Sequence, residues 1–375
     1  MKVSVSQQNL AHGLSIVSRA VASRSTLPVL SNILLATDEG RLRLSATNLE
    51  MGITCWIGAK IEEEGSITIP ARTLTDLVNT LPNEILWLTL NSHTQSIEIK
   101  CTTTSSDIKG IDSQEFPPMP VPDPDSGVVL NVADLKEMIQ QVVFAASPDE
   151  ARPVLMGAQL SIVDNEMTMA AADGFRISVK TAALSSPVAA PLSVIIPARA
   201  LSELARIAEG SDQSVTMTIP AGRGQVIFTL KDVELASQMI EGKFPDFNQI
   251  IPRNYKTRTI LSTSSMLKAC KQVEVFAREG SNVARVNLKP MGDDQVSIVE
   301  MNAANEETGS SDVVLDATIE GIPLLIAFNV RFLREVLEVI KSPNVALETT
   351  AANTPGVIHP VGDDSFTHVI MPMHL

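Results

Sequence analysis

Some acidic and basic side chains of this sequence have spacings that could support acid–base or metal chemistry. Pairs of aspartates occur at 293–294 and 363–364, and Asp173 lies three residues before Arg176. Such groups could act as an acid, a base or metal ligands. Adjacent residues of a strand point to opposite faces, however, so these pairs would make poor chelates. Solvated turns explain them better, and we expect no metal site.

Nucleophilic and histidine-based chemistry has no matching motif either. The histidines are His12, His93, His359, His368 and His374. They show no HxH or HExxH spacing, so surface or packing roles are expected for them. The sequence contains no GxxxxGK[ST], GxSxG or GxGxxG pattern, and GRGQ at 222–225 favours a hairpin turn. Catalysis is therefore disfavoured, and no cofactor is expected.

Length and composition favour several domains without a membrane span. A chain of 375 residues exceeds one ordinary core, which predicts two or three domains. No apolar run approaches the roughly 18 residues that a span needs, and MKVSVSQQNL lacks the apolar stretch of a secretory signal. Cys55, Cys101 and Cys270 fit neither a disulfide framework nor a CxxC metal site, so buried thiols are expected. We expect a cytoplasmic protein with no membrane partner.

The net charge restricts how the chain could contact nucleic acid. A net charge of −14 argues against coating nucleic acid by bulk electrostatics, which needs clustered Lys and Arg. Aromatic residues make up only 3% of the chain, too few to stack single-stranded bases. Any DNA contact must therefore be local.

The elements that would position functional residues occur in three copies. Each copy opens with a strand and an amphipathic helix, starting near residues 3, 128 and 259. Apolar residues with helical spacing are Leu10, Leu14, Val17 and Val21 in the first copy and Met266, Cys270, Val273 and Ala277 in the third. This spacing predicts that one face of each helix is buried.

A second helix follows later in each copy. Strands from about 67, 194 and 326 lead into it, with Arg72, Arg199 and Arg331 at one equivalent position and Leu74, Leu201 and Leu333 at another. Segments of alternating polarity between the helices predict strands joined by polar turns. Each copy is thus predicted to be an α+β unit, with two helices packed on antiparallel sheet.

Proline-rich breaks separate the copies. FPPMPVPDPDSG at 116–127 contains five prolines, which favour an extended linker, and a weaker break lies at 250–258. The predicted domains are residues 1–120, 127–251 and 257–375.

Motifs spread over the whole chain resemble one family. They are TLPVLSNILL at 26–35, TNLEM at 47–51, IPAR at 69–72, RPVLMGAQL at 152–160, AADGFRIS at 171–178, EGKFPDFNQIIP at 241–252 and HVIMPMHL at 368–375. Their order and spacing resemble the bacterial DNA sliding clamp, the beta subunit of DNA polymerase III. The resemblance implies a protein without enzymatic activity, whose chain has the DNA clamp fold of three similar domains. It also implies that two chains close as a head-to-tail homodimer around double-stranded DNA. It implies helices lining the hole, with the ring tethering the replicative polymerase.

The charge of the predicted helices fits this expectation. Residues 7–24, 71–82, 131–147, 198–210, 264–280 and 330–342 hold twelve Lys or Arg against nine Asp or Glu, so a net +3 leaves −17 elsewhere. A mildly basic bore would attract the phosphate backbone without reading its sequence. By resemblance Arg24 is a DNA-contacting residue, and Arg72, Arg152 and Arg199 are further candidates. The alternative is that each is a solvated surface residue or a helix-end ion pair.

The resemblance also implies a groove between the second and third domains for short apolar peptides of the polymerase, the clamp loader and other partners. The residues carried over are Leu155, Ala172, Gly174, Phe175, Arg176, Ile177, Pro245, Gln249, Ile250, Asn329, Phe332, Pro355, Val369, Ile370, Met371, Pro372, Met373, His374 and Leu375. Ala172 and Phe175 stand where Thr and His are typical, and Gln249 where Arg is. The fine specificity for peptides stays open at these positions.

Two alternatives remain open. The VIMPM segment could be a final core strand, although Pro372 cannot donate within a central ladder. The chain could also be an interaction scaffold that dimerises without touching DNA, since a helix charge of +3 could arise by chance.

Overall fold

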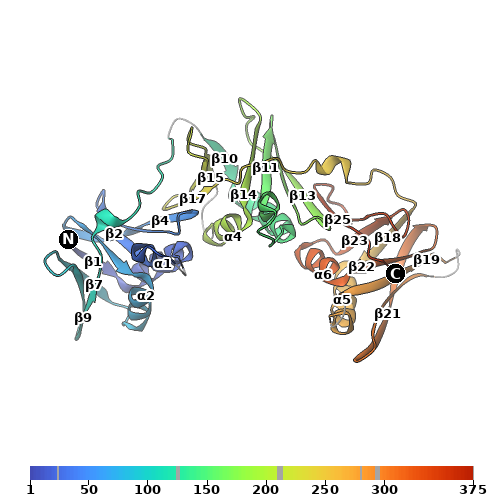
Figure 1. The fold of residues 1–375 in the computed structure, drawn as a ribbon, viewed down its shortest axis with the longest axis horizontal. Helices are drawn as coiled ribbons and strands as arrows, with labels where there is room; N and C mark the ends of the chain where they lie inside the picture. The colour runs from blue at the N-terminus through green and yellow to red at the C-terminus, as the bar shows by residue number, and fades with distance from the viewer. Residues whose placement is uncertain (23–24, 124–126, 209–213, 279–280, 292–295, 375) are drawn as a thin grey trace. The chain divides into compact units, whose positions relative to one another are not determined.

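A computed structural model describes residues 1–22, 25–123, 127–208, 214–278, 281–291 and 296–374. The chain forms two compact units. Figure 1 labels the helices and strands that they contain. Unit 1 comprises Met1–Ala133 and Glu203–Met239, and unit 2 comprises Asp134–Ser202 and Ile240–Leu375. Each unit is described by itself below.

Unit 1 contains two antiparallel sheets, ordered β5-β1-β7-β8-β9 and β10-β15-β16-β17-β4-β3-β2-β6. Their strands are β1 (Lys2–Ser6), β2 (Asn32–Asp38), β3 (Arg41–Thr47), β4 (Met51–Gly58), β5 (Lys60–Glu63), β6 (Ser66–Pro70), β7 (Ile85–Asn91), β8 (Ser96–Cys101), β9 (Thr104–Lys109), β10 (Val128–Asn131), β15 (Ser214–Thr218), β16 (Gln225–Thr229) and β17 (Val233–Gln238). The second sheet joins the first and second sequence copies, because β17 pairs with β4.

Unit 2 contains one sheet of twelve described strands, ordered β14-β11-β12-β13-β25-β24-β23-β18-β21-β20-β19-β22. These are β11 (Gly157–Val163), β12 (Glu166–Ala172), β13 (Arg176–Ala183), β14 (Leu192–Pro197), β18 (Thr257–Ser262), β19 (Val283–Lys289), β20 (Ser297–Asn305), β21 (Gly309–Gly321), β22 (Leu324–Asn329), β23 (Asn344–Thr349), β24 (Gly356–Pro360) and β25 (Phe366–Ile370). The pairing of β13 with β25 joins the second and third copies.

Six helices accompany these sheets in the described ranges. They are α1 (Gln7–Val17), α2 (Ala71–Thr80), α3 (Val132–Val142), α4 (Ala198–Ile207), α5 (Thr263–Ala277) and α6 (Val330–Val339). Side-chain caps precede α1, α5 and α6: Ser6 Oγ accepts from Asn9 N, Ser262 Oγ accepts from Ser265 N, and Asn329 Oδ1 accepts from Arg331 N. The predicted arrangement, three α+β domains with two helices each, is confirmed.

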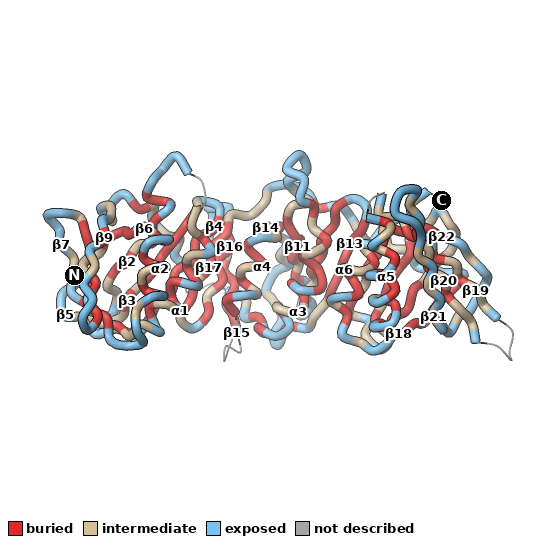
Figure 2. The backbone as a smooth tube through the Cα atoms, turned by 90° about the horizontal axis from the view of Figure 1, so that it is seen from below, coloured by how far each residue is buried: buried red, intermediate tan, exposed pale blue. Residues whose placement is uncertain are grey.

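The predicted helix faces pack into the cores. Leu10, Leu14 and Val17 of α1 are fully buried, as are Leu74, Leu201 and Leu333 of the second helices. Figure 2 shows buried residues along the strands and helices, with exposed residues at the turns. Val21 differs from the expectation, because α1 ends at Val17 and Val21 lies beyond it, only half-buried.

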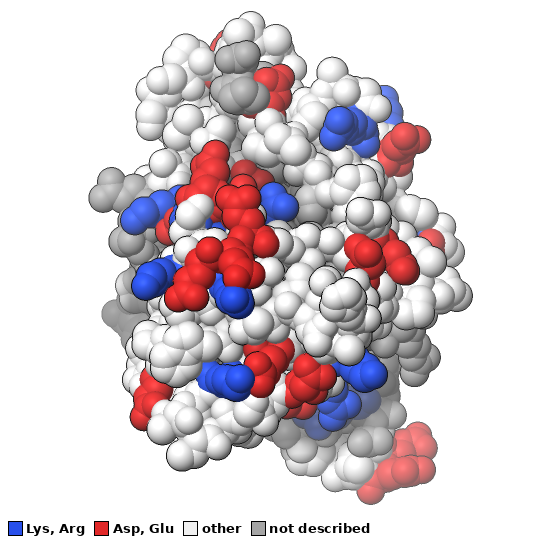
Figure 3. All heavy atoms as spheres, turned by 90° about the vertical axis from the view of Figure 1, so that its left-hand side faces the viewer, with Lys and Arg blue, Asp and Glu red and all other residues white. Residues whose placement is uncertain are grey.

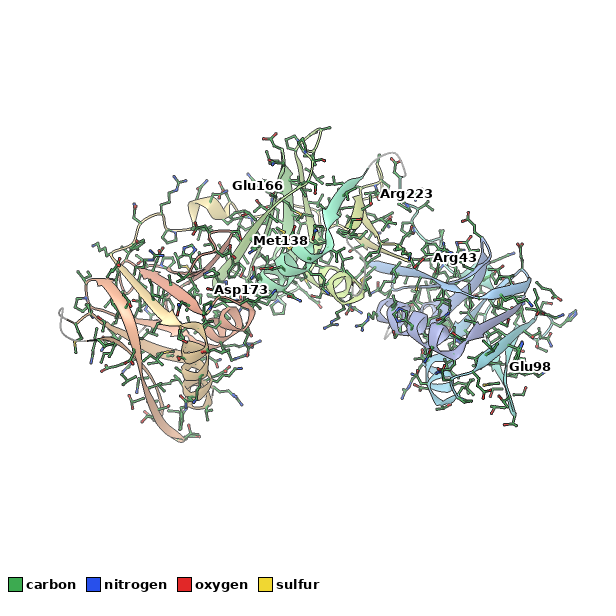
Figure 4. All side chains as sticks on the ribbon, turned by 180° about the vertical axis from the view of Figure 1, so that it is seen from behind. Arg43, Glu98, Met138, Glu166, Asp173 and Arg223 are labelled. Atoms are coloured by element: carbon green, nitrogen blue, oxygen red, sulfur yellow. The ribbon has the colours of Figure 1, made fainter. Side chains whose placement is uncertain are left out.

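The three cysteines are free and buried, as predicted. Burial raises the pKa of the Cys55 and Cys270 thiols to about 12, with nearby Asp232 and Glu274 adding smaller upward shifts. Neither thiol is therefore a reactive thiolate at neutral pH. The GRGQ segment forms the predicted turn between β15 and β16, with Arg223 at its tip (Figure 4).

The surface of unit 1 mixes both charge signs. Figure 3 shows acidic and basic side chains side by side on the end near the N-terminus, with the acidic ones gathered into clusters. Lys2 pairs with Glu63, and Lys100 pairs with Glu98 at 2.8 Å. None of the described helices is long and apolar enough to cross a membrane.

Candidate functional site

The last strand, β25, sits in the middle of the unit 2 sheet. It pairs with β13 through Ile177 and Val369 and with β24 through Val357 and Val369. Val369 and Ile370 are almost fully buried. The reading of the C-terminal segment as a core strand is therefore right for these two residues.

The chain leaves the core directly after Ile370. Met371 N donates to Phe175 O at 2.8 Å, and Met373 N donates to Ala327 O at 2.8 Å, with Pro372 between them. Met371 is 40% exposed and His374 is exposed, whereas Leu375 lies outside the described residues. The tail is thus fastened by two backbone hydrogen bonds, with Met371 and His374 exposed and Pro372 and Met373 half-buried.

The turn between β12 and β13 presents an exposed aromatic ring next to this tail. Asp173, labelled in Figure 4, accepts from Phe175 N at 2.8 Å and from Arg176 N at 3.0 Å through Oδ1. Gly174 adopts φ +95°, a conformation that favours glycine. The Phe175 side chain is left 61% exposed. Phe175 and Met371 therefore form neighbouring apolar surface.

Arg176 lies beneath this surface and is only 7% exposed. Its Nε donates to Asp173 Oδ2 at 3.0 Å, its Nη1 to Glu335 Oε2, and its Nη2 to Phe144 O at 3.0 Å. Its guanidinium carbon lies 4.2 Å from the centroid of the Phe332 ring. Arg176 thus connects β13, α6 and the turn at Phe144, and it does not present its charge to solvent.

A small apolar cluster forms the other side of the site. Ala172 and Ile177 pack with Phe244, and Leu155 and Phe247 lie against them, partly buried. The segment that carries Pro245 continues into a short 3-10 helix, Phe247–Gln249. Gln249 Nε2 donates to Asp246 Oδ2 at 2.7 Å, and Ile250 is 41% exposed.

The structure separates the expected peptide-site residues by exposure. Buried are Ala172, Arg176, Ile177, Val369 and Ile370; half-buried are Leu155, Asn329, Phe332, Pro355, Pro372 and Met373; exposed are Gly174, Phe175, Pro245, Gln249, Ile250, Met371 and His374. The half-buried and exposed residues offer most of the surface that a ligand could touch, and the buried residues support them.

The four expected DNA-contacting residues fall into different places. Arg24 lies outside the described residues. Arg72 and Arg199 are exposed at the second position of α2 and α4, and the Arg72 side chain is 96% exposed with Asp76 at 3.7 Å. Arg152 lies instead beside the β12–β13 turn, where it donates to Asp149 at 2.9 Å and to Asp173 O at 3.0 Å.

Many basic side chains of the helices are already paired. Arg19 pairs with Glu203, and Arg334 with Glu274. Within the described part of the chain, Arg199, Lys268 and Arg278 are exposed and have no carboxylate within 4.0 Å. These unpaired cations are the strongest helix-borne candidates for phosphate contact.

The acidic pairs behave as turn residues where they are described. Asp363 accepts from Ser365 N at 2.9 Å and from Lys180 Nζ at 3.0 Å, while the pair at 293–294 lies outside the described residues. In the described ranges, no group of three or more His, Cys, Asp or Glu side chains could hold a metal.

His368 is a structural residue that its spacing in the sequence did not reveal. It is fully buried in β25, with Nδ1 2.6 Å from Ser178 Oγ and its ring stacked on Phe144 at 5.5 Å. The only sequence feature that pointed to this buried role was the position of His368 in an apolar strand. Burial lowers the pKa of His368 well below its ordinary 6.5, and the Arg176 charge lowers the pKa further.

This histidine predicts an acid-sensitive core. A lowered pKa in the folded state means that protonation favours unfolding, so its contribution is complete above pH 6.5 and declines as the pH falls below that value. The expected loss is about 1.4 kcal/mol per pH unit for one proton. Urea unfolding at pH 7.0 and pH 5.5 measures it. The account fails if a His368→Gln variant keeps the same pH dependence.

Comparisons with known proteins cover the whole chain. Models of the N-terminal, central and C-terminal domains of the DNA polymerase III beta subunit match residues 1–120, 129–246 and 248–374. The beta sliding clamp of Synechococcus elongatus is 33% identical over all of both chains, and that of Staphylococcus aureus is 29% identical over 100% of this chain and 99% of its own.

Solved structures agree in fold. The sliding clamp of Bacillus subtilis superposes with a TM-score of 0.94 at 27% identity, covering 100% of this chain and 99% of its own. The DNA polymerase III subunit beta of Pseudomonas aeruginosa gives a TM-score of 0.91 at 25% identity, with both chains fully covered. The chain therefore belongs to the family of the bacterial beta sliding clamp, the beta subunit of DNA polymerase III.

Proposed function

We propose that two copies of this chain close head to tail into a ring around double-stranded DNA. The observation that carries this proposal is whole-length similarity to beta sliding clamps combined with a threefold repeat of one α+β domain. When identical chains contact each other through two different surfaces, the assembly closes into a ring if the rotation that relates neighbouring chains adds up to a full circle. The ring does no chemistry; it keeps the replicative polymerase on DNA. It acts in the cytoplasm, where bacterial DNA is replicated. The three domains of each chain are residues 1–120, 127–251 and 257–375.

We further propose that the inner surface attracts DNA weakly and without sequence preference. The exposed arginines at equivalent helix positions, Arg72 and Arg199, and the unpaired Lys268 and Arg278 support a scattered rather than a dense basic surface. Each phosphate contact increases affinity and salt dependence, so few contacts permit sliding while ring closure prevents loss. Arg24 belongs to the same proposal by its position after α1.

The peptide site proposed for partners centres on Phe175 and Met371. These residues carry accessible apolar surface next to each other, and the buried Arg176 and Ile177 hold the turn and the tail in place. Methionine and phenylalanine adapt to varied apolar partners. The polymerase, the clamp loader and other proteins would dock here through short apolar segments.

Reversing two helix charges should weaken DNA binding without disturbing the ring. In the double variant Arg72→Glu with Arg199→Glu, each lost phosphate contact should make the plot of log K against log salt concentration less steep by about 0.9. We therefore expect the magnitude of its slope to fall by about 2 or more. Affinity for duplex DNA over a salt series measures this slope, and light scattering checks the dimer.

The matched control is Arg223→Glu with Arg285→Glu, which changes the net charge equally at an exposed hairpin tip and an exposed strand position. This control should bind DNA much as the parent does. Equal losses in both double variants would mean that overall charge, rather than the helix surface, attracts DNA.

A further inference from the structure

Unit 1 contains a second copy of the architecture that forms the proposed peptide site of unit 2. In unit 2, Asp173 Oδ1 accepts from Phe175 N and Arg176 N; in unit 1, Asn48 Oδ1 accepts from Glu50 N at 3.1 Å and from Met51 N at 2.8 Å. The same turn therefore precedes β13 and β4.

The neighbouring strand is copied as well. Gln238 N donates to Glu50 O at 2.8 Å, as Met371 N donates to Phe175 O at 2.8 Å. The β4–β17 register, Met51 opposite Ser237, matches the β13–β25 register, Arg176 opposite Ile370. Glu50 thus corresponds to Phe175 and Gln238 to Met371.

The segment behind the small apolar cluster of the unit 2 site also has a counterpart in unit 1, both in sequence and in packing. FPPM at 116–119 corresponds to FPDF at 244–247. Phe116 is buried in one cluster with Leu30, against which Met119 packs, just as Leu155 and Phe247 pack against the cluster that contains Phe244. All three walls of the peptide site therefore have counterparts within unit 1.

A pocket of about 180 Å³ lies among these counterparts in unit 1. Its lining includes Leu49, Met119 and the prolines at 117, 118 and 120 as apolar residues, and Gln225 and Gln238 among its polar residues. An apolar cavity of about 150 Å³ holds a benzene-sized group. The pocket is therefore large enough for an apolar side chain of a ligand.

Leu49 at the rim of this pocket is an unusual residue. It adopts φ +75° where its counterpart is Gly174, and its side chain is 52% exposed. A bulky residue in this left-handed region costs about 1–2 kcal/mol, and such strain concentrates at binding sites. The fold thus holds an apolar side chain at the opening against its backbone preference.

The charge of the lining differs between the two sites. The unit 1 pocket includes one carboxylate, Glu50, and no lysine or arginine, and Glu50 has no cation within 4.0 Å among the described residues. At the unit 2 site, Arg152 lies beside the corresponding turn, where it pairs with Asp149. The unit 1 pocket therefore favours a basic ligand, because a cation next to an unpaired carboxylate is attracted.

We propose that the unit 1 pocket is a second docking site, which takes a short extended peptide with a leucine-sized apolar side chain flanked by lysine or arginine. This inference rests on the proposed peptide binding of unit 2, whose architecture it repeats. The two sites would therefore differ in the charge of the partner segments that they bind.

Methionine methyl NMR of the full-length protein tests this directly, since Met119 reports on the unit 1 pocket and Met371 on the unit 2 site. The probes are acetyl-Ala-Lys-Leu-Leu-Lys-Ala-amide and the same peptide with glutamate in place of lysine. The lysine probe should shift the Met119 signal saturably and bind this pocket about tenfold more tightly than the glutamate probe. Met119→Leu and Met371→Leu assign the signals.

Two variants sharpen the result. Glu50→Lys should reverse the preference between the probes, whereas Glu64→Lys, an exposed charge change of the same size in unit 1, should not. A Cβ at Gly52 would lie 2.6 Å from Met119 Cε, the flexible end of a side chain, so Gly52→Ala should push this methyl aside and weaken both probes.

The proposal is overturned if neither probe shifts Met119 at millimolar concentration, or if Glu50→Lys leaves the preference unchanged. Failure of the proposed function would appear separately, as a Met371 signal that responds to no peptide taken from a polymerase or clamp loader.

Discussion

A chain that ends at Ile370 is expected to lose partner-peptide binding while it stays folded. The deletion removes Met371, which is 40% exposed next to the 61% exposed Phe175, and with it one wall of the proposed peptide site. Burial of each large apolar side chain stabilises a complex by about 1.5–3 kcal/mol. Loss of two such contacts should weaken binding by about 100-fold to 10,000-fold, which takes a micromolar ligand beyond easy detection.

The cost to folding should be small by comparison. The deletion removes the hydrogen bonds Met371 N to Phe175 O and Met373 N to Ala327 O, each worth about 1 kcal/mol. β25 itself remains between β13 and β24. Fluorescence anisotropy with a labelled polymerase peptide and thermal melting of the same protein measure the two effects.

Two single substitutions separate the side chain from the backbone. Met371→Ala keeps the hydrogen bond to Phe175 O and should still lose much of the affinity, whereas Met291→Ala, at a methionine of unit 2 that is 44% exposed, should lose none. Unchanged peptide affinity together with a sharp drop in melting temperature would make the tail a purely structural strand.

The second large effect is expected at Arg176. Arg176→Ala should destabilise unit 2 by about 3–5 kcal/mol, because it removes the cation that pairs with the poorly solvated Asp173 carboxylate. Glu335 keeps only its other partners, Arg331 and Arg334. The Asp173 and Glu335 side chains are only 11% and 17% exposed. Burial raises the pKa of Glu335, but hydrogen bonds from Arg331 and Arg176 outweigh it and leave the pKa below its ordinary 4.5. That contribution is therefore present above pH 4.5 and lost below it.

Arg331 offers a matched control, because it pairs with the same Glu335 at 2.7 Å but its side chain is 60% exposed. Arg331→Ala should cost less than about 1 kcal/mol. Urea unfolding of both variants measures the difference. Similar losses for Arg176 and Arg331 would show that the buried network does not hold β13 and α6 together.

Local patterns predicted most of the secondary structure and the repeat. Leu10, Leu14 and Val17 share a helical spacing that can only bury one face, and the structure buries them all. The equivalent leucines at 74, 201 and 333 are buried for the same reason. These features depend on residues close in sequence, so composition and periodicity suffice to find them.

Pairings between distant segments could not be predicted in this way. Two of the three partners of Arg176, Phe144 and Glu335, lie 32 and 159 residues away, and no local pattern specifies them. The same holds for Arg152, which was expected to contact DNA and which donates to Asp173 O, 21 residues away. The strand pairs that join successive copies, β4 with β17 and β13 with β25, likewise depend on tertiary structure and not on residues close in sequence.

The most direct test of the account compares retention on circular and linear DNA. The protein is assembled on nicked circular DNA by a bacterial clamp loader, and half of the sample is then linearised with a restriction enzyme before gel filtration. A ring of two 40.2 kDa chains should elute with the circle at moderate salt and be lost from the linear DNA, because only topology holds it. Equal retention on both forms, or a protein that light scattering shows to be a monomer, would contradict the proposed clamp.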